Sequence, residues 1–563
     1  MIRALVRTPL VWILCAAAAL RITGLFWGLP AADGWDNDGF APRNFLTALA
    51  LTYTPGSYFT YPPLHAFVLA ILTLPGIVSA LLQTPSFGQA DVIGEITKPA
   101  YMTFFAVVAR LVTAAMSLGI IWCIGEMTRR IAGARAGLFA AGACALGVVF
   151  TYYSQVSNLD VPYLFWASLS LLLCMRAVTE RRSRLFWWAA LLAAAAIATK
   201  DQAYAVFALS LPLFLLAWFM ADAWPRRHAR AVFTTLLPAV MVSLLALLLV
   251  DGAITNPIGF ARRVAFLTGP ASQDYAQYLQ SPAGWMALLE DMARFFLRGH
   301  GVVAVLLAAF GLGLHLSRFR DDKAIWVAGL LPGLAIISFI LCFNFSALRT
   351  DHRFLLPQAL FAAVYIGIAA DFLAFHTARS LAFGARFLLA AIALFSLHQA
   401  IAVNAAMLFD PRYDVERWMA AHVRPGDTIE IYGQNIFQPR FPATARVIRV
   451  GQGDLKVRNP LPRVTELKEA FAAPRDAKFI IVSGNWVRRY LREARPTRTG
   501  RIYDKTQRDA FRDGDARRYF SALDEGRLPY RLVHVARFQG KFWPAVRIHD
   551  SLAEPIGIYE RLP

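Results

Sequence analysis

Charged residues are scarce in this chain of 563 residues. Only 17% are Asp, Glu, Lys or Arg, against about 25% in typical soluble domains, whereas 57% are hydrophobic. Such a composition excludes a disordered chain and argues against an ordinary soluble enzyme. It is typical of a protein that crosses a membrane several times.

Cysteine is also scarce, and the polar C-terminal part has none. The five cysteines all lie in apolar stretches: Cys15, Cys123, Cys144, Cys174 and Cys342. The C-terminal part therefore carries no disulfide, whatever its compartment. No two cysteines are close in sequence, which excludes a metal site built from paired thiolates.

Acidic residues are fewer than basic ones, 37 against 57, and the net charge is +20. Nucleic acid is the usual partner of such a chain, but the charge does not gather in one patch. Residues 407–563 hold 29 of the Lys and Arg and 19 of the Asp and Glu, so they account for half of the net positive charge. This polar segment is the size of one domain.

Two short patterns predict an α/β fold for residues 407–563. VRPGDTIEIYG (423–433) is a turn followed by an alternating strand, and DAKFIIVSG (476–484) is a buried strand flanked by turn residues. Segment 486–518 is rich in arginine with scattered aromatics. It predicts a solvated, partly helical face, with contact to anionic headgroups or an anionic glycan as the alternative.

Long apolar runs fill residues 1–406. A bilayer core needs about 20 apolar residues per helix. By this measure we predict eleven spans: 8–29, 103–125, 136–151, 160–176, 185–199, 203–221, 232–250, 301–316, 324–345, 354–373 and 387–406. Segment 61–84 is also apolar and long enough to cross.

Lys and Arg in short loops indicate the cytoplasmic side and decide how segment 61–84 lies. If it does not cross, 17 basic residues share one side: Arg3, Arg7, Arg129, Arg130, Arg135, Arg176, Arg181, Arg182, Arg184, Arg226, Arg227, Arg230, Arg318, Arg320, Lys323, Arg379 and Arg386. If it crosses, Arg3 and Arg7 face away from the rest. We therefore predict an interfacial or re-entrant helix over 61–84 on the outer face. The N-terminus is then cytoplasmic, and residues 407–563 form an extracytoplasmic domain after a membrane domain of residues 1–406.

The first predicted outer loop, GLPAADGWDNDGFAPRNF (28–45), packs Asp33, Asp36 and Asp38 into six residues. A solvated acidic loop is the simplest interpretation. However, acids are scarce here, and the loop is rich in Gly, Trp and Phe. It also leads into the aromatic segment SYFTYPPLHAF (57–67), which suits a membrane interface. A carboxylate at that boundary can act as a general base on a hydroxyl.

Cations lie at two predicted outer edges of the membrane, away from the basic inner loops. One is Lys200, in IATKDQAYAV (197–206). The others are Arg349, His352 and Arg353, in FSALRTDHRFLLPQ (345–358). Cations at this depth predict a functional site, and phosphate is their natural ligand. Headgroup snorkelling is the alternative. For Arg21 and Arg110, near or within spans, we expect a structural ion pair or a bond to a backbone carbonyl.

Asp160 begins a predicted span in QVSNLDVPYLFW (155–166). It suits a helix cap and a site role about equally. His65 with Asp36 or Asp38 is a weak pattern for a metal site, and we predict none.

Together these elements resemble the GT-C class of glycosyltransferases. They are most similar to the glycosyltransferase family 39-like group of dolichyl-phosphate-mannose protein mannosyltransferases and bacterial lipid A aminoarabinose transferases. The matching elements, in the family's order, are RITGLFWGLP (21–30), GWDND (34–38), YFTYPPLHAFVLA (58–70), LDVP (159–162), ATK (198–200) and RFLLP (353–357). One position departs: Asn37 stands where the family has a second acid, and Asp38 follows. The segment beyond 407 resembles the small outer α/β domains of some bacterial members.

The resemblance implies a GT-C-like fold and a membrane enzyme, and the Ala- and Arg-rich residue usage indicates a bacterial inner (plasma) membrane. The enzyme would move a sugar, with inversion, from a polyprenyl-phosphate donor to a hydroxyl of a lipid, protein or polysaccharide. No cofactor is required, and a divalent metal is neither required nor excluded. A lipid-linked sugar flippase or transporter, and a non-catalytic envelope assembly protein, stay open as alternatives. Nucleic acid is disfavoured, because topology explains the basic loops.

The resemblance also implies roles for nine residues. Asp36 is the expected catalytic base, with Asp38 as the second candidate for the acidic pair. The residues expected to hold the donor phosphate are Lys200, Arg349, His352 and Arg353. Those expected to bind or orient a substrate are Asp160, Tyr61 and His65.

Overall fold

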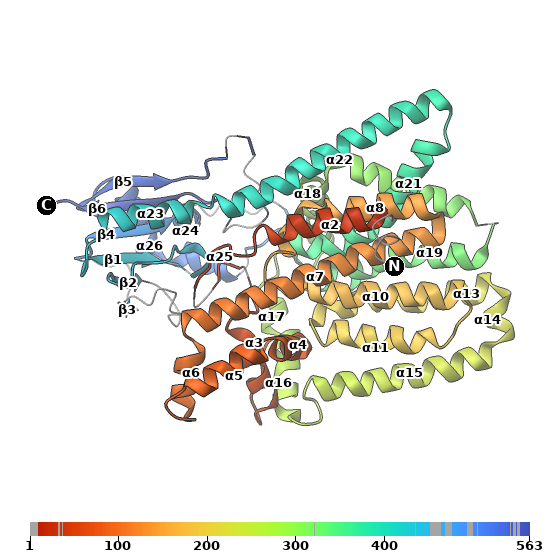
Figure 1. Cartoon of the computed structure of the whole chain (residues 1–563), viewed down its shortest axis with the longest axis horizontal. Helices are drawn as coiled ribbons and strands as arrows, with labels where there is room; N and C mark the ends of the chain where they lie inside the picture. Colours follow the sequence, from red (N-terminus) through yellow and green to blue (C-terminus); the bar gives the residue numbers. More distant parts are fainter. Residues whose placement is uncertain are drawn as a thin grey trace.

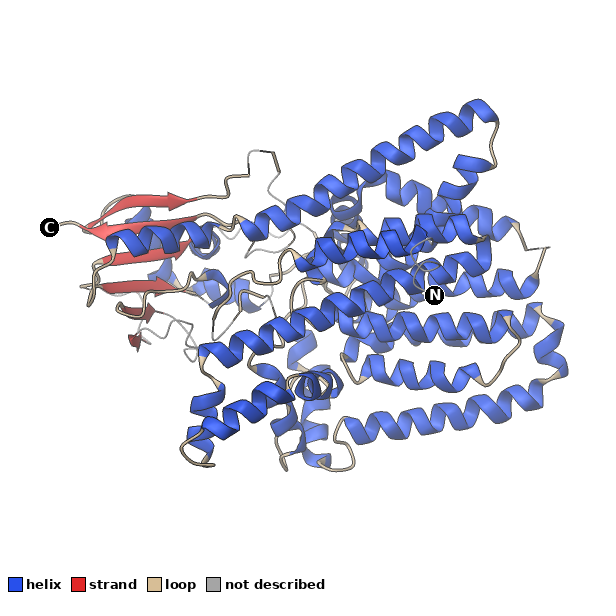
Figure 2. Cartoon of the chain, in the orientation of Figure 1, coloured by secondary structure: helices blue, strands red, loops and turns tan. Residues whose placement is uncertain are grey.

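A helical bundle and a smaller α/β domain lie end to end in this computed structural model (Figure 1). The structure describes residues 9–31, 34–36, 38–319, 321–433, 435–450, 463–467, 476–491, 499–503, 505–540, 542–543, 548 and 552–563. Nearly all of the bundle is helix, and the strands are confined to the other domain (Figure 2). The predicted fold class, a polytopic helical membrane protein with a C-terminal α/β domain, is confirmed.

All eleven predicted spans are helical. Their main helices are α2 (Pro9–Ile22), α7 (Pro99–Ala132), α8 (Ala134–Ala145), α10 (Asp160–Thr179), α11 (Leu185–Ile197), α13 (Ser210–Ala221), α15 (Ala229–Val250), α18 (Pro282–Ser317), α19 (Lys323–Phe339), α21 (Leu356–Phe375) and α22 (Arg379–Leu408). Short helices extend several of them: α9 (Val148–Tyr153), η1 (Asp201–Ala203), α12 (Tyr204–Phe207), η2 (Ile340–Asn344), α20 (Phe345–Ala347) and η3 (His352–Leu355).

Length and apolarity alone support fewer crossings than eleven. Within the described residues, eight helical stretches are long and apolar enough to cross a membrane. The other three, α2, α8 and α11, have 14, 12 and 13 residues. Helix α8 is short because the helix breaks at Leu146 and Gly147. Helix α9 continues the predicted segment after this break.

Segment 61–84 forms two helices rather than the one predicted. These are α4 (Leu64–Leu72) and α5 (Leu74–Gln83), and the chain bends by 65° between them. Pro75, in the first turn of α5, has no N–H to bond back across the joint. A sharp bend fits a re-entrant or interfacial segment, and the pair counts as a ninth span only if both halves cross together.

The connections 30–60 and 252–300, which lie between predicted apolar segments, also contain helices. Loop 30–60 contains α3 (Asn44–Tyr53), and α6 (Gln89–Ile96) precedes α7. Connection 252–300 contains α16 (Pro257–Thr268), α17 (Pro270–Gln273) and the first half of α18. Gly301 separates that half from the predicted span, because its φ of 78° is not helical. Residues other than glycine adopt this φ only with strain.

The predicted basic loops lie away from the α/β domain. Helix α14 (Ala223–Arg227) carries Arg226 and Arg227 and sits at the end of the bundle opposite the sheet (Figure 1). This placement agrees with the charge asymmetry of the sequence. Which side is cytoplasmic stays a prediction.

A six-stranded sheet organises the C-terminal domain, in the order β3-β2-β1-β4-β6-β5. Its strands are β1 (Thr428–Tyr432), β2 (Arg446–Val450), β3 (Arg463–Leu467), β4 (Phe479–Ser483), β5 (Tyr530–Ala536) and β6 (Ile556–Arg561). The first four are parallel, and β6 and β5 continue the sheet antiparallel. Both strands predicted from the sequence are present, as β1 and β4.

Helices cover both faces of this sheet. Alternate residues of a strand point to opposite faces. Ile429 and Ile431 therefore pack with α23 (Pro411–His422), and Tyr432 packs with α26 (Gly514–Asp524). The described part of segment 486–518 contains most of α24 (Gly484–Leu491), α25 (Lys505–Arg512) and the start of α26, so it is partly helical as predicted.

Candidate active site

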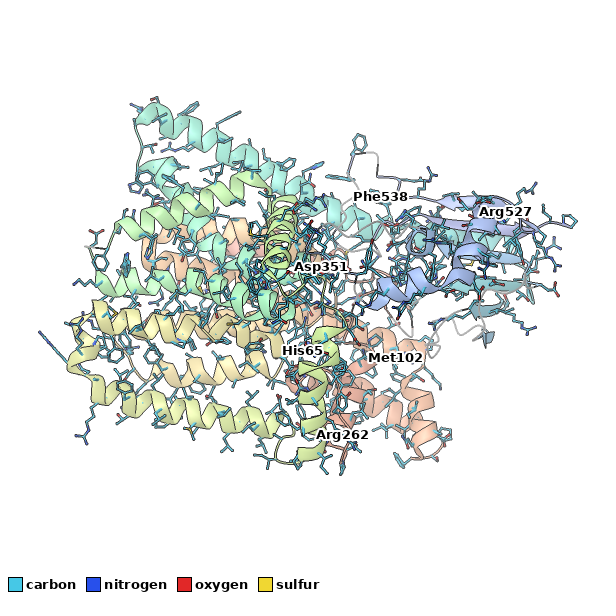
Figure 3. All side chains as sticks on the ribbon, turned by 180° about the vertical axis from the view of Figure 1, so that it is seen from behind. His65, Met102, Arg262, Asp351, Arg527 and Phe538 are labelled. Carbon is cyan, nitrogen blue, oxygen red and sulfur yellow. The ribbon has the colours of Figure 1, made fainter. Side chains whose placement is uncertain are left out.

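The candidate site lies at the end of the bundle that faces the α/β domain. Three stretches of chain meet there: the loop after α2, the turn between α11 and α12, and the segment between α20 and α21. Figure 3 shows His65 and Asp351, which flank this region, at that end of the bundle.

Asp36 is a buried carboxylate with all its contacts inside the protein. It is 5% exposed, and Arg110 of α7 is fully buried beside it. Arg110 binds both oxygens, through Nη2 at 2.5 Å and Nε at 3.2 Å. The backbone N–H and the hydroxyl of Ser157 each donate to Oδ2 at 2.8 Å. These contacts confirm the predicted ion pair for Arg110. Arg110 and Ser157 together occupy both carboxylate oxygens of Asp36.

Asp38 lies nearer to solvent, and its side chain is 41% exposed. Its carboxylate is ion-paired with the guanidinium of Arg353, which lies 315 residues later. The backbone of Asp38 has a φ of 49°, a left-handed conformation that Asp tolerates better than most residues. Asp33 and Asn37 lie outside the described residues.

Lys200 and Asp160 form a second ion pair, with Nζ 2.6 Å from Oδ1. Asp160 is fully buried and also accepts from Gln202 Nε2 at 3.0 Å. It starts α10, yet its side chain bonds to Lys200 and Gln202 rather than capping the helix. Its Oδ2 has no hydrogen-bond partner among the described residues. Burial lowers the pKa of Lys200, and the charge of Asp160 acts against this.

The guanidinium groups of Arg349 and Arg353 both pack against the ring of Phe354. Each guanidinium is 4.7 Å from the centre of the Phe354 ring. The Nε atoms of both are buried and lack a hydrogen-bond partner within the described part of the chain. Burial lowers the pKa of Arg349, and the positive charge of Arg353 lowers it further.

The two ion pairs and the arginines form one electrostatic cluster. Arg353 interacts with both Asp38 and Asp160, and Lys200 interacts with Arg353 and Asp38. Asp351 also interacts with Arg349 and Arg353, so the cluster of Lys200, Arg349 and Arg353 with Asp38, Asp160 and Asp351 carries three positive and three negative charges. The buried Nε–H donors of Arg349 and Arg353, which lack partners among the described residues, make this cluster suitable for an anion.

Tyr61 borders the cluster. Burial raises the pKa of its hydroxyl, and the charge of Asp38 adds to this. The ring of Phe40 lies 6.5 Å from that of Tyr61 and 6.1 Å from that of Phe59, so the loop carrying Asp38 packs against segment 57–61.

Two predicted site residues point elsewhere. His352 packs its ring against Phe295 of α18, with 5.0 Å between ring centres. His65 is 2% exposed and lies against Phe40, at 6.1 Å. Among the described residues there is no group of three or more His, Cys, Asp or Glu that fits a metal ion.

Arg21, the other cation near a span, is structural as predicted. It is fully buried, and its Nη1 bonds to the carbonyls of Ala17 at 3.1 Å and Ala145 at 3.3 Å. Sequence reasoning missed Ser157 and Gln202. Their closeness in sequence to predicted site residues could have indicated them: Ser157 precedes Asp160 by three residues, and Gln202 follows Lys200 by two.

A cavity of 410 Å³ lies beside the segment that carries Arg349. Its lining residues are Gln280, Trp285, Leu341, Phe345, Ser346 and Leu348, a mixture of polar and apolar side chains. A volume of this size is in the range of ligand sites.

A polytopic helical bundle with a cluster of cationic side chains at the end that faces the α/β domain is consistent with an enzyme that handles a lipid phosphate. Residues 102–250 match the family model of dolichyl-phosphate-mannose-protein mannosyltransferases. This match confirms the resemblance drawn from the sequence motifs. No curated protein sequence matches the chain.

Solved structures show distant likenesses. ArnT from Cupriavidus metallidurans bound to undecaprenyl phosphate is 14% identical, with 97% of each chain covered and a TM-score of 0.47. The Archaeoglobus fulgidus oligosaccharyltransferase complex with Zn and sulfate is 15% identical, with a TM-score of 0.42. That match covers 76% of this chain and 60% of the oligosaccharyltransferase, so this chain spans about three fifths of that relative's length.

Proposed function

We propose that this chain transfers a sugar from a polyprenyl-phosphate donor to an acceptor hydroxyl at the outer face of a bacterial inner membrane. The observation that carries the proposal is the cluster of Lys200, Arg349 and Arg353, which offers buried cationic donors to one anion. A phosphate ester held there would place the start of its lipid tail near the 410 Å³ cavity beside Leu348. The family match agrees with such a donor.

The donor phosphate is the leaving group of the reaction. The bond between the anomeric carbon and the phosphate oxygen breaks, and its electron pair stays on the phosphate. Cations aimed at that oxygen stabilise the growing charge, which lowers the barrier only insofar as the contacts tighten in the transition state. The acceptor oxygen forms the new bond from the opposite face, so the anomeric configuration inverts.

Asp38 suits the role of general base better than Asp36. A general base needs an accessible lone pair near the reacting hydroxyl. Asp36 is enclosed by Arg110 and Ser157, whereas Asp38 is part-exposed and next to the cation cluster. A phosphate that binds Arg353 competes with Asp38 for this guanidinium. Donor binding would thus free the Asp38 carboxylate to accept the proton of the acceptor. Asp36 then holds the loop in place.

The three cations replace the charge that a divalent ion supplies in other phosphate-handling enzymes. We therefore propose that transfer needs no metal. Asp160 holds Lys200 in position, and Tyr61 borders the space beside Asp38 where an acceptor would approach.

The test is sugar transfer, or slow hydrolysis, from a panel of labelled polyprenyl-phosphate sugars in membranes that contain the wild type or Asp38→Asn. Asn keeps the shape of Asp but cannot take the proton. We expect turnover of at least one donor by the wild type and a loss of at least 10²-fold in the variant. Donor binding by the wild type without any turnover, under every acceptor offered, would instead favour a lipid carrier.

A further inference from the structure

The connection 274–281, between α17 and α18, joins the C-terminal domain to the segment that carries Arg349. On one side it pairs with residues 500–502 of the C-terminal domain. On the other side it bonds to residues 348–350. It is therefore a physical link between two parts of the chain that lie more than a hundred residues apart.

The C-terminal side of this link is a short β-bridge strengthened by ion pairs. Tyr278 and Arg501 form an antiparallel bridge. The backbone N–H of Ile502 donates to Gln277 O, and that of Leu279 donates to Gly500 O, both at 2.9 Å. Arg501 also binds Asp291 of α18, through Nε at 2.7 Å and Nη2 at 3.0 Å.

Two further features hold this contact closely. The hydroxyl of Tyr278 donates to Asp291 Oδ2 at 2.9 Å, so one carboxylate ties both bridge residues. Gly500 has a φ of 87°, and a Cβ there would come within 2.2 Å of Ala283 O. Only glycine fits this approach without movement of the backbone.

The site side of the link is built on Gln277. Its backbone N–H donates to Leu348 O at 2.8 Å, and its Oε1 accepts from the backbone N–H of Thr350 at 3.3 Å. These two bonds bracket Arg349. The ring of Tyr275 also lies 5.5 Å from the Arg349 guanidinium. Leu348 adopts a left-handed φ of 47°, a conformation uncommon for leucine.

We infer that Gln277 and Arg501 are positioning residues, through which the C-terminal domain sets the place of Arg349 and so the affinity for the donor phosphate. The inference rests on the proposed function. It gives residues 407–563 a definite task in donor recognition. Gln277 acts through the backbone on either side of Arg349, and Arg501 acts by holding the segment that carries Gln277.

The test uses the full-length protein and undecaprenyl phosphate as the binding probe. Gln277→Ala removes a side-chain acceptor, and Arg501→Ala removes the ion pair to Asp291. Arg488→Ala is the matched control, because Arg488 pairs with Glu554 inside the C-terminal domain. Each variant is compared with the wild type for thermal unfolding, probe affinity, donor KM and kcat.

We expect Gln277→Ala and Arg501→Ala to weaken probe binding and raise donor KM on the order of tenfold, with kcat changed little. Arg488→Ala should leave both unchanged. In an Arg349→Ala background the two substitutions should add nothing further, because they act through Arg349. If Arg501→Ala does not fold, Gln277→Ala decides alone.

The failures of the two claims are distinguishable. If Arg349→Ala weakens probe binding but Gln277→Ala and Arg501→Ala behave like Arg488→Ala, the link has no role in donor affinity. Effects that add fully to those of Arg349→Ala would also overturn it. If the wild type does not bind the probe, or Arg349→Ala binds it normally, the proposed phosphate site itself is wrong.

Discussion

Replacing Asp36 or Asp38 by Asn should give opposite effects on stability and activity. Asp36 is 5% exposed and Arg110 is fully buried, so Asp36→Asn leaves an uncompensated guanidinium in the interior. Removal of one partner from a buried ion pair costs about 3–5 kcal/mol. Asp38 is part-exposed, and loss of its ion pair should cost about 1 kcal/mol or less after solvent screening.

A double variant separates a structural Asp36 from a catalytic one. Asp36→Asn with Arg110→Gln removes both buried charges and keeps two groups that hydrogen-bond to each other. We expect it to regain much of the lost stability and to transfer sugar within about tenfold of the wild type. Asp38→Asn should be as stable as the wild type but lose at least 10²-fold in kcat, the usual contribution of a general base.

The assay combines unfolding temperature in detergent with transfer in membranes, normalised to the amount of folded protein. The result that would refute the reasoning is a stable Asp36→Asn/Arg110→Gln protein without activity, together with an active Asp38→Asn protein. That pair of results would make Asp36 the base, as the family resemblance implies.

Three further predictions concern donor use, metal and pH. Arg353→Ala should lower kcat/KM for the donor on the order of 10²-fold with little change in acceptor KM, and kinetics in which only the acceptor is affected would place Arg353 elsewhere. Dialysis against EDTA should leave the transfer rate unchanged, and a loss restored by one divalent ion would contradict the metal-free account. Burial raises the pKa of Asp251 to about 6, against an unfolded value near 4, so the folded state favours its protonated form. The resulting stability, about 3 kcal/mol at most, should be present below pH 4 and disappear as the pH rises through 6. Unfolding temperatures measured from pH 4 to 7 should therefore fall less in Asp251→Asn than in the wild type.

Much of the helical domain could be predicted because its signal is local. Apolar length located the helices of all eleven predicted spans, and turn residues flanking short apolar runs located β1 and β4. The connection 252–300 was harder, since α16 and the start of α18 are less apolar and are helical through contacts within the protein. Hydropathy alone also did not predict the kink at Gly301 or the bend at residue 73.

The site was predicted as a set of residues rather than as a geometry. Sequence order suggested that Asp38, Lys200 and Arg353 gather at one edge of the membrane, and the structure brings them together. Composition gave no means to assign Arg110 to Asp36, a pairing across 74 residues. The link from Arg501 to Gln277 was equally hidden, because it joins two polar segments with no periodic pattern.

The most direct test of the central claim is donor binding and turnover by the cation cluster. Labelled polyprenyl-phosphate sugar should be presented to the wild type, Arg353→Ala and Asp38→Asn in the same membranes. The account predicts that the wild type binds and turns over the donor, that Arg353→Ala loses most of the binding, and that Asp38→Asn binds normally but does not transfer. Equal binding and equal transfer by all three proteins would contradict it.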